Sequence, residues 1–286
     1  MENTDIDWNL EWKLRMERNE AQKGSGCSSY WDTRESALKF YESSFEDGGE
    51  RVNWIVGNIP YTPDSRILDV GAGPGTIAIP LAGRAAAVTA VEPSPAMAGV
   101  LREKIAENGI ENITVVEKPW EAVDPGSDLN PPYDIVFASF SLGMHDLWEA
   151  IDKMNSVCRG RVLLFHFAGG NSWEPMMREL WPIMHGEEFH PGPKADIIFN
   201  LLYSKGIYPD IVSAPHGYRL DYKSIDDAVD EFAKRLNAET GEHYGILRKY
   251  FCEKLEQDPE TREYYMDMRS RKMCISWDSP GNFENR

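Results

Sequence analysis

The chain of 286 residues has few cysteines and no long apolar run. Its four cysteines stand far apart, at Cys27, Cys158, Cys252 and Cys274, and no C-x-x-C pair occurs. This spacing favours reduced, mostly buried thiols over a disulfide framework or a zinc site. The best apolar stretch, 77–91, is interrupted by an arginine and is shorter than the roughly 18 residues that a membrane span needs.

Basic side chains are also scarce, because 30 Lys+Arg face 47 Asp+Glu and give a net charge of −17. Nucleic acids and anionic membranes are bound through basic patches, so this balance argues against both as general partners. Residues 1–8 are polar and acidic and lack the pattern of a secretion signal. The composition therefore predicts a cytoplasmic protein with no membrane and no nucleic-acid partner.

From residue 66 to residue 167 short apolar runs alternate with amphipathic segments. Ser94, Pro95 and Asn108 mark the two ends of one of these segments as a helix. The apolar runs are continuous, as in strands covered on both faces of a parallel sheet. They are 67–70, 87–91, 113–116, 133–139 and 161–165. The alternation predicts an α/β fold with a doubly wound, mostly parallel sheet of seven strands.

The segments that flank this alternation are predicted to be additions to the sheet. Residues 1–60 are expected to form a helical cap, in which Asp32 and Glu35 have the spacing of a capping box. Residues 61–286 are expected to form the sheet domain. It includes a lid over 171–193, whose two glycines and four prolines favour a bent loop over a continuous helix. A helical insertion is expected over 221–272, before the last strand.

The strongest chemical signal is the glycine loop after the first strand, Asp69-Val-Gly-Ala-Gly-Pro-Gly-Thr76. Glycines allow a tight turn and a close approach to a ligand, and the following helix supplies free N–H donors. The pattern is G-x-G-x-G, and Thr76 stands where a dinucleotide fingerprint has its third glycine. Glu92 ends the second strand, where a carboxylate can accept hydrogen bonds from ribose hydroxyls. A nucleoside without a pyrophosphate is therefore predicted in preference to NAD.

On these motifs, residues 66–167 resemble the class I S-adenosylmethionine (SAM)-dependent methyltransferases, particularly the group that acts on small molecules. The resemblance implies SAM as cofactor, S-adenosylhomocysteine (SAH) as product and a small methyl acceptor as partner. Asp69 resembles the acid that orients the loop and the amino group, and Glu92 resembles the acid that binds the ribose. The implied cofactor contacts are Asp69, Gly71, Ala72, Gly73, Glu92, Pro93, Met97, Trp120, Ser139 and Phe140.

The region after the third strand departs from the pattern of the family. Many members have an aspartate near the position of Pro119, and this chain does not. The resemblance therefore leaves Trp120 to supply stacking and a backbone donor to the adenine. A second motif, Asn130-Pro-Pro-Tyr133, spells a tetrapeptide of enzymes that methylate amide or adenine nitrogens. In those enzymes it follows the fourth strand, whereas here it precedes that strand and is interpreted as a turn.

Histidines are the candidates for proton transfer and metal binding. His145 closely follows the fourth strand, where a neutral imidazole can act as a general base; the alternative is a histidine that caps or packs on the next helix. His166 ends the fifth strand and is interpreted as structural. His185 and His190 lack the helical spacing of zinc ligands, and no metal site is predicted.

Aromatic residues outside the sheet pattern are expected to cover the acceptor, because a methyl-transfer site must exclude water. The same rings can instead dock the helices that carry them. The residues in question are Tyr30, Trp31, Tyr41, Trp173 and Trp181. The predicted activity is methyl transfer to a small or medium-sized metabolite. The alternatives are methylation of RNA or protein, and a non-catalytic SAM-binding sensor or partner subunit.

Overall fold

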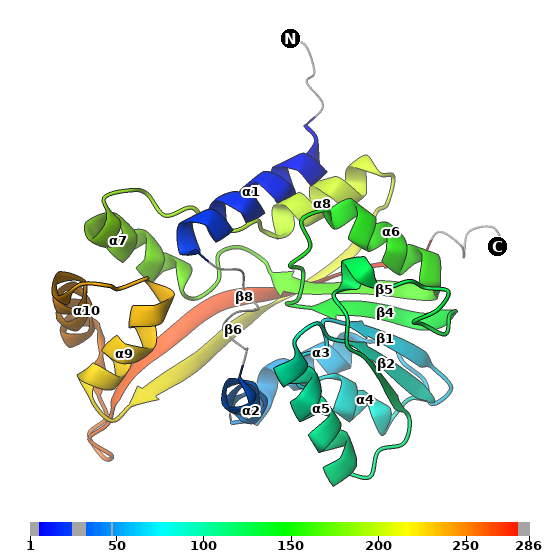
Figure 1. The fold of residues 1–286 in the computed structure, drawn as a ribbon, viewed down its shortest axis with the longest axis horizontal. Helices are drawn as coiled ribbons and strands as arrows, with labels where there is room; N and C mark the ends of the chain where they lie inside the picture. Colours follow the sequence, from blue (N-terminus) through cyan, green and yellow to red (C-terminus); the bar gives the residue numbers. More distant parts are fainter. Residues whose placement is uncertain (1–5, 25–32, 47, 280–286) are drawn as a thin grey trace.

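The computed structural model describes residues 6–24, 33–46 and 48–279, and it is built around one eight-stranded sheet (Figure 1). The order is β3-β2-β1-β4-β5-β8-β6, with β7 paired to β8. Neighbours from β3 to β5 are parallel, while β8 runs antiparallel to β5, β6 and β7. The bounds are β1 Arg66–Val70, β2 Ala87–Val91, β3 Ile113–Val116, β4 Tyr133–Ser139, β5 Cys158–Phe167, β6 Asp210–Tyr222, β7 Glu256–Gln257 and β8 Tyr264–Asp278.

Helices cover both faces of the sheet, which explains the continuous apolar runs of its central strands. One face packs against helices α3, α4 and α5, and the other packs against α1, α6 and α8 (Figure 1). The bounds of these helices are α1 Trp8–Lys23, α3 Glu50–Asn58, α4 Ala78–Ala82, α5 Pro95–Glu107, α6 Leu147–Val157 and α8 Ala195–Ser204. The predicted mostly parallel, doubly wound α/β fold is confirmed, although the sheet has eight strands instead of the expected seven, because the two-residue β7 pairs with β8.

Helix α2 (Arg34–Ser43) packs on α5 through a small cluster that contains Ala37, Met97 and Val100. Its N-cap is Thr33, which forms a capping box with Ser36. The box is thus one residue later than the predicted pair, and Asp32 lies outside the described residues.

The strands β6 and β8 extend beyond the rest of the sheet and carry α7 (Glu174–His185), α9 (Ile225–Arg235) and α10 (Gly241–Lys254) (Figure 1). These helices enclose an apolar cluster of their own, which includes Leu180, Trp181, Phe232 and Phe251. The two strands are 13 and 15 residues long. The second begins at Tyr264, so the insertion expected over 221–272 is helical only as far as Lys254, and its remainder belongs mostly to strands. The outer halves were missed because partly exposed polar side chains break the apolar pattern there.

Two further elements differ from the expectations. The segment 171–193 contains the helix α7 instead of a bent loop throughout, because Pro175 falls in the first turn, where proline is tolerated. Helix α1 was not predicted as a separate element, yet Trp12 is fully buried and its indole Nε1 donates to the Met144 carbonyl at 2.8 Å.

Within the described ranges, no helix is long and apolar enough to cross a membrane. Of the three cysteines in those ranges, Cys158 and Cys274 are buried and Cys252 is exposed, and all three are free thiols.

Candidate functional site

The glycine loop follows β1 at the carboxyl end of the sheet, as predicted. Gly71, Gly73 and Gly75 all have positive φ, at 77°, 57° and 90°, a region that side chains rarely adopt. A Cβ on Gly71 would lie 2.3 Å from the Ser141 Cβ, so this glycine is needed for close packing within the protein. A Cβ on Gly73, by contrast, would meet nothing within 4 Å. Of these two glycines, Gly73 is the one that faces open space.

Glu92 ties the loop to the end of β2. Its Oε2 accepts from the Gly73 N–H at 2.7 Å, and its Oε1 accepts from the Ser94 N–H at 2.8 Å. Burial raises the pKa of Glu92, while these two backbone hydrogen bonds oppose the shift. Because each carboxylate oxygen has two lone pairs, Glu92 keeps acceptor capacity for hydroxyl donors from a ligand.

Asp69 is the second buried carboxyl group of the site. It is only 2% exposed, and within the described ranges no residue donates a hydrogen bond to its carboxylate. Burial raises the pKa of Asp69 well above its usual value, and the nearby negative charge of Glu92 raises it further. A buried carboxylate without a donor is costly, so this position is suited to a cationic ligand group that donates hydrogen bonds.

The end of β4 forms the neighbouring edge of the site. Ser139 pairs in register with Phe165 of β5, and the next residue, Phe140, has a φ of 54°. Such a backbone is strained in a residue other than glycine, and strained residues of this kind cluster at functional sites. Ser141 then donates its hydroxyl to the Val70 carbonyl at 2.6 Å, so the β4 end is fastened directly to the glycine loop.

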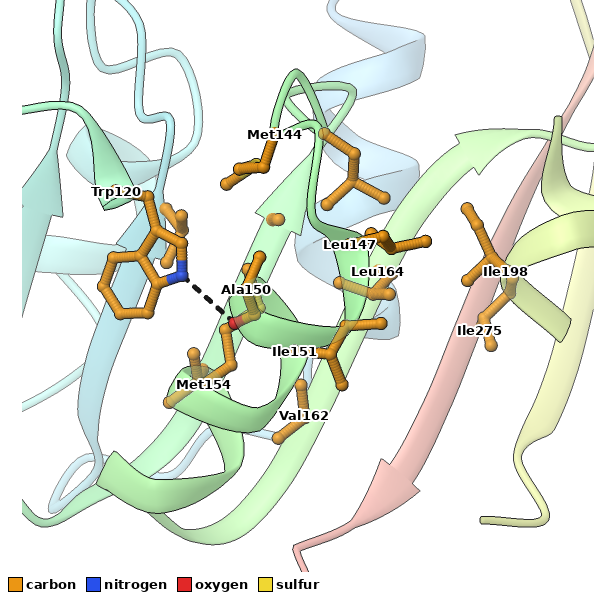
Figure 2. Close-up of a cluster of buried hydrophobic side chains, with 14 of the residues drawn as sticks. Trp120, Met144, Leu147, Ala150, Ile151, Met154, Val162, Leu164, Ile198 and Ile275 are labelled. Carbon is orange, nitrogen blue, oxygen red and sulfur yellow. Dashed lines mark hydrogen bonds between the residues drawn. The ribbon is translucent and has the colours of Figure 1, made fainter. Parts of the chain in front are cut away.

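Two of the predicted cofactor contacts are turned into the protein. The Trp120 ring is buried in the core against α6, and its Nε1 donates to the Ala150 carbonyl at 3.1 Å (Figure 2). The ring is already packed against side chains of α6 and of the surrounding core. The prediction that it stacks on an adenine is therefore wrong. Met97 is also buried, between α2 and α5, where it packs with Ala37. Pro93 is exposed, and Ala72 is buried beneath the loop.

The histidines are engaged with nearby groups. His145 Nε2 lies 2.8 Å from a Glu20 carboxylate oxygen on α1, so the ring links this helix to the loop after β4. His166 donates Nδ1–H to the Phe167 carbonyl at 3.1 Å, and burial lowers its pKa. His185 donates Nε2–H to the Leu236 carbonyl at 2.8 Å. Among the described residues, no group of three or more His, Cys, Asp or Glu side chains could hold a metal ion.

The predicted lid aromatics separate into different environments. Tyr41 packs α2 onto α5, with its ring 5.4 Å from the Lys104 ammonium. Trp181 is buried in the cluster of α7, α9 and α10, and this burial overturns its assignment to the acceptor side. Trp173 is partly exposed and contacts Tyr218 of β6. Tyr30 and Trp31 lie outside the described residues.

Two cavities lie at the opposite, amino end of the sheet. Their volumes are about 370 Å³ and 480 Å³, and both are lined by Pro60 and Arg161. The first also includes Asp134, which directly follows the Asn130–Tyr133 motif, so this motif lies away from the glycine loop as predicted. Ligands of doubly wound sheets bind at the carboxyl ends of the strands, so these cavities are not the candidate site.

Several aromatic residues on β5 and β6 were not predicted as site residues. Phe167 ends β5 and its ring centroid lies 4.8 Å from that of Phe140. His216 and Tyr218 follow on β6, with ring centroids 5.6 Å apart. The sequence signal for His216 and Tyr218 was their spacing of two positions within the strand-like stretch 212–218. This spacing places both side chains on one face of a strand.

Comparison with known proteins identifies the central part of the chain. Residues 67–160 match a family described as a methyltransferase domain. An uncharacterised protein of Haemophilus influenzae is 31% identical over 153 residues, which cover 52% of this chain and 53% of that protein. The 23S rRNA (uracil(1939)-C(5))-methyltransferase RlmD of Salmonella choleraesuis is 31% identical over 114 residues, covering 34% of this chain and 26% of that enzyme. The chain thus spans about half or less of the length of these two relatives.

A solved structure shows the same fold. Phosphoethanolamine N-methyltransferase 2 of Haemonchus contortus, solved in complex with SAM, aligns with a TM-score of 0.51 at 16% identity. The alignment covers 87% of this chain and 57% of that one. The comparisons thus show a methyltransferase domain over residues 67–160 and a shared fold over most of the chain.

Proposed function

We propose that the chain is a SAM-dependent methyltransferase that acts on a small or medium-sized metabolite in the cytoplasm. The observation that carries this proposal is the pair of buried carboxyl groups at the glycine loop. Glu92 holds the loop through the Gly73 N–H, and Asp69 is buried without a donor from the described residues. A ligand with both an ammonium group and a ribose satisfies the two carboxylates together.

The residues fit SAM as follows. Asp69 would accept hydrogen bonds from the amino group of the methionine part, and Glu92 would accept them from the ribose hydroxyls. Gly73 would let the ligand approach the backbone, because its outward side is open. When bound, SAM supplies a methyl group that is already activated by a positively charged sulfur and has a neutral leaving group.

The task left to the protein is to align the acceptor and to exclude water. In this proposal residues 1–60 act as a cap, and residues 61–286 hold the cofactor and the acceptor. Within the second part, the segment 171–193 and the insertion 221–272 lie beside the acceptor. A general base is needed only for an acceptor whose proton must leave early. His145 remains a prediction for that role, although its Nε2 is already bonded to Glu20.

Methylation of RNA is the second candidate, and the partial match to the 23S rRNA methyltransferase favours it. The net charge of −17 opposes it, because RNA binding relies on clustered basic side chains.

The remaining alternative is a SAM-binding subunit without catalysis. Such a subunit would bind SAM but form no methylated product, so turnover distinguishes it from an enzyme. Protein incubated with a cell extract and methyl-labelled SAM should yield one labelled product, which mass spectrometry then identifies.

Calorimetry tests the cofactor directly. We expect SAM and SAH to bind with micromolar dissociation constants and NAD to bind far more weakly. The variant Gly73→Val should lose SAM and SAH binding, because its side chain enters the space at the loop. The matched control is Gly109→Val: Gly109 has a φ of 60° and equally open surroundings, but it lies at the far end of α5.

The control separates backbone strain from ligand contact. Both variants place a branched side chain at a positive φ, so both should lose similar stability, and only Gly73→Val should lose the ligand. NAD binding in preference to SAM would overturn the cofactor assignment. Full SAM affinity in Gly73→Val would show that the cofactor does not lie against this loop.

A further inference from the structure

The first part of β6, residues 210–214, forms an exposed edge of the sheet; we call these residues the edge segment. Strand β6 is the last in the sheet order, and within the described ranges it pairs with β8 alone. Ile211 is 44% exposed and Val212 is 48% exposed. The backbone groups of a free edge can pair with another strand, so natural proteins guard such edges with charged side chains, prolines or a covering element.

Charged side chains do not guard this edge. Asp210 is the one charged residue from Ile207 to Ala214, and its carboxylate is ion-paired with Arg161 of β5. Two copies of a chain with a net charge of −17 repel each other overall, and this repulsion is weakest where a surface carries no unpaired acid. The edge segment therefore suits a second copy of the acidic chain better than it suits a basic partner.

Exposed apolar side chains gather beside the edge segment. Tyr203 at the end of α8 is 59% exposed, and Tyr208 in the following loop is 73% exposed. Their ring centroids lie 5.3 Å apart. On the sheet, Ile211 and Val212 line the cavity of about 480 Å³, which leaves room for side chains of a partner. A concentration of exposed apolar groups on a monomer indicates a contact with another protein.

Two prolines delimit the edge segment symmetrically, because Pro209 and Pro215 stand three positions on either side of Val212. Proline has no N–H, so within a strand its nitrogen faces away from the ladder. Pro215 lies within β6, and its nitrogen therefore faces the free edge. Backbone groups alternate in direction along a strand, so Ile211 and Ser213 also direct their N–H and C=O groups outward.

We propose that the chain forms a symmetric dimer, in which the edge segment pairs antiparallel with the edge segment of a second copy. The two-fold axis passes between the two Val212 residues, so that Ile211 of each copy faces Ser213 of the other. These two residue pairs exchange four backbone hydrogen bonds. Pro209 then lies opposite Pro215, and the pairing stops there with no N–H left unpaired.

The closure of this arrangement identifies a second copy as the partner. The opposite end of the sheet is β3, and pairing of β6 with β3 of another copy would be head-to-tail and would continue without end. Pairing of β6 with itself closes at two copies. Three strands separate β6 from β1, which the glycine loop follows, so the dimer leaves this loop accessible. The dimer thus goes beyond the proposed methyltransferase function and does not depend on it.

Analytical ultracentrifugation of the full chain tests the dimer. We expect a species of twice the mass of the chain, which dissociates on dilution. Val212→Lys places two ammonium groups face to face at the axis and should weaken the dimer roughly tenfold or more. Ile183→Lys is the matched control, because Ile183 is 62% exposed but lies on α7.

Two results of this experiment would overturn the proposal. One is a chain that stays monomeric up to about 100 µM protein, where even a weak specific dimer would be populated. The other is a dimer that Val212→Lys leaves unchanged or that Ile183→Lys weakens equally.

A proline variant tests the direction of the edge groups. Ser213→Pro should remove an N–H that faces outward, so it should abolish the dimer and leave the ladder with β8 and the melting temperature almost unchanged. Loss of the folded state, measured by circular dichroism, would show that this N–H faces β8 and would contradict the proposed pairing. The Val212→Lys variant tests the dimer without altering a backbone N–H.

Cysteine variants test the register, in a background that carries Cys27→Ser and Cys252→Ser. In Val212→Cys the two thiols meet at the axis, where the Cα atoms of such a pair lie about 4.5 Å apart, within the range of a disulfide. Diamide takes up the two protons and two electrons of the thiols and should link this variant into a covalent dimer. Ile211→Cys, which faces Ser213 of the other copy, should cross-link far less. Equal cross-linking of both variants, or none in either, would contradict the register.

Discussion

Asp69 is the residue at which stability and function are in conflict. Its carboxyl group is buried, and both burial and the charge of Glu92 raise its pKa. An acid with a raised pKa in the folded state stabilises the protein most below its unfolded pKa of about 4, and this stability is lost as the pH rises through the folded pKa. The ligand-free protein should therefore become less stable from acidic toward neutral pH through this group.

The variant Asp69→Asn tests this conflict. It removes the ionisation, so we expect the ligand-free variant to be more stable than the unchanged chain at pH 7 by about 1 kcal/mol, with a smaller difference near pH 4. The same variant should lose most of its SAM affinity, because a neutral amide cannot replace the carboxylate beside an ammonium group. Urea unfolding at the two pH values and calorimetry with SAM measure both effects. A variant that is less stable at pH 7 and binds SAM normally would contradict the assignment of Asp69.

At the scale of elements, α2 and α7 are expected to respond differently to ligand. Helix α2 is held to α5 by a small cluster around Ala37 and Met97, close to the cofactor side of β2. Helix α7 belongs to a larger apolar cluster with α9 and α10 and is already well buried. Slow exchange reflects burial and stable hydrogen bonds, so the less buried helix has more protection to gain.

Hydrogen exchange with and without SAH measures this difference. We expect SAH to slow amide exchange in residues 33–46 and to leave Glu174–His185 of α7 almost unchanged. Equal slowing in both helices would mean that α7 closes with the ligand as a lid. No change in either, with protection confined to residues 69–76, would mean that neither helix covers the site.

At the scale of the whole molecule, the charge distribution distinguishes the small-molecule proposal from the RNA alternative. The compact basic run 268–272 has Arg269 and Arg271 exposed on β8, but its Lys272 is buried and bound to Glu50. This run therefore contributes only two exposed arginines, in a chain with a net charge of −17.

Filter binding with transfer RNA as probe at 50 mM salt tests the RNA alternative. We expect no retention below about 100 µM protein, the weak end of non-specific binding. Retention at low micromolar protein that weakens steeply with salt, and that Arg269→Glu abolishes, would support an RNA acceptor instead.

The sequence by itself determined the central strands of the sheet and the loop. Its continuous apolar runs, the cap at Ser94 and the glycine spacing are local signals, because covered strands, helix ends and tight turns each require particular residues within a few positions. For the same reason β2, β3, β4 and α5 lie where the pattern predicted them. Glu92 followed from its place at the end of a strand, and Asp69 from the resemblance to the methyltransferase family.

Only the tertiary structure decided which aromatic rings face the site. Trp120 and Trp181 are buried in two different cores, whereas Phe140, Phe167, His216 and Tyr218 stand together on one surface. These four residues come from the position after β4, from β5 and from β6. A ring has the same local pattern whether it packs inward or faces a ligand, so its environment depends on distant segments that the fold brings beside it.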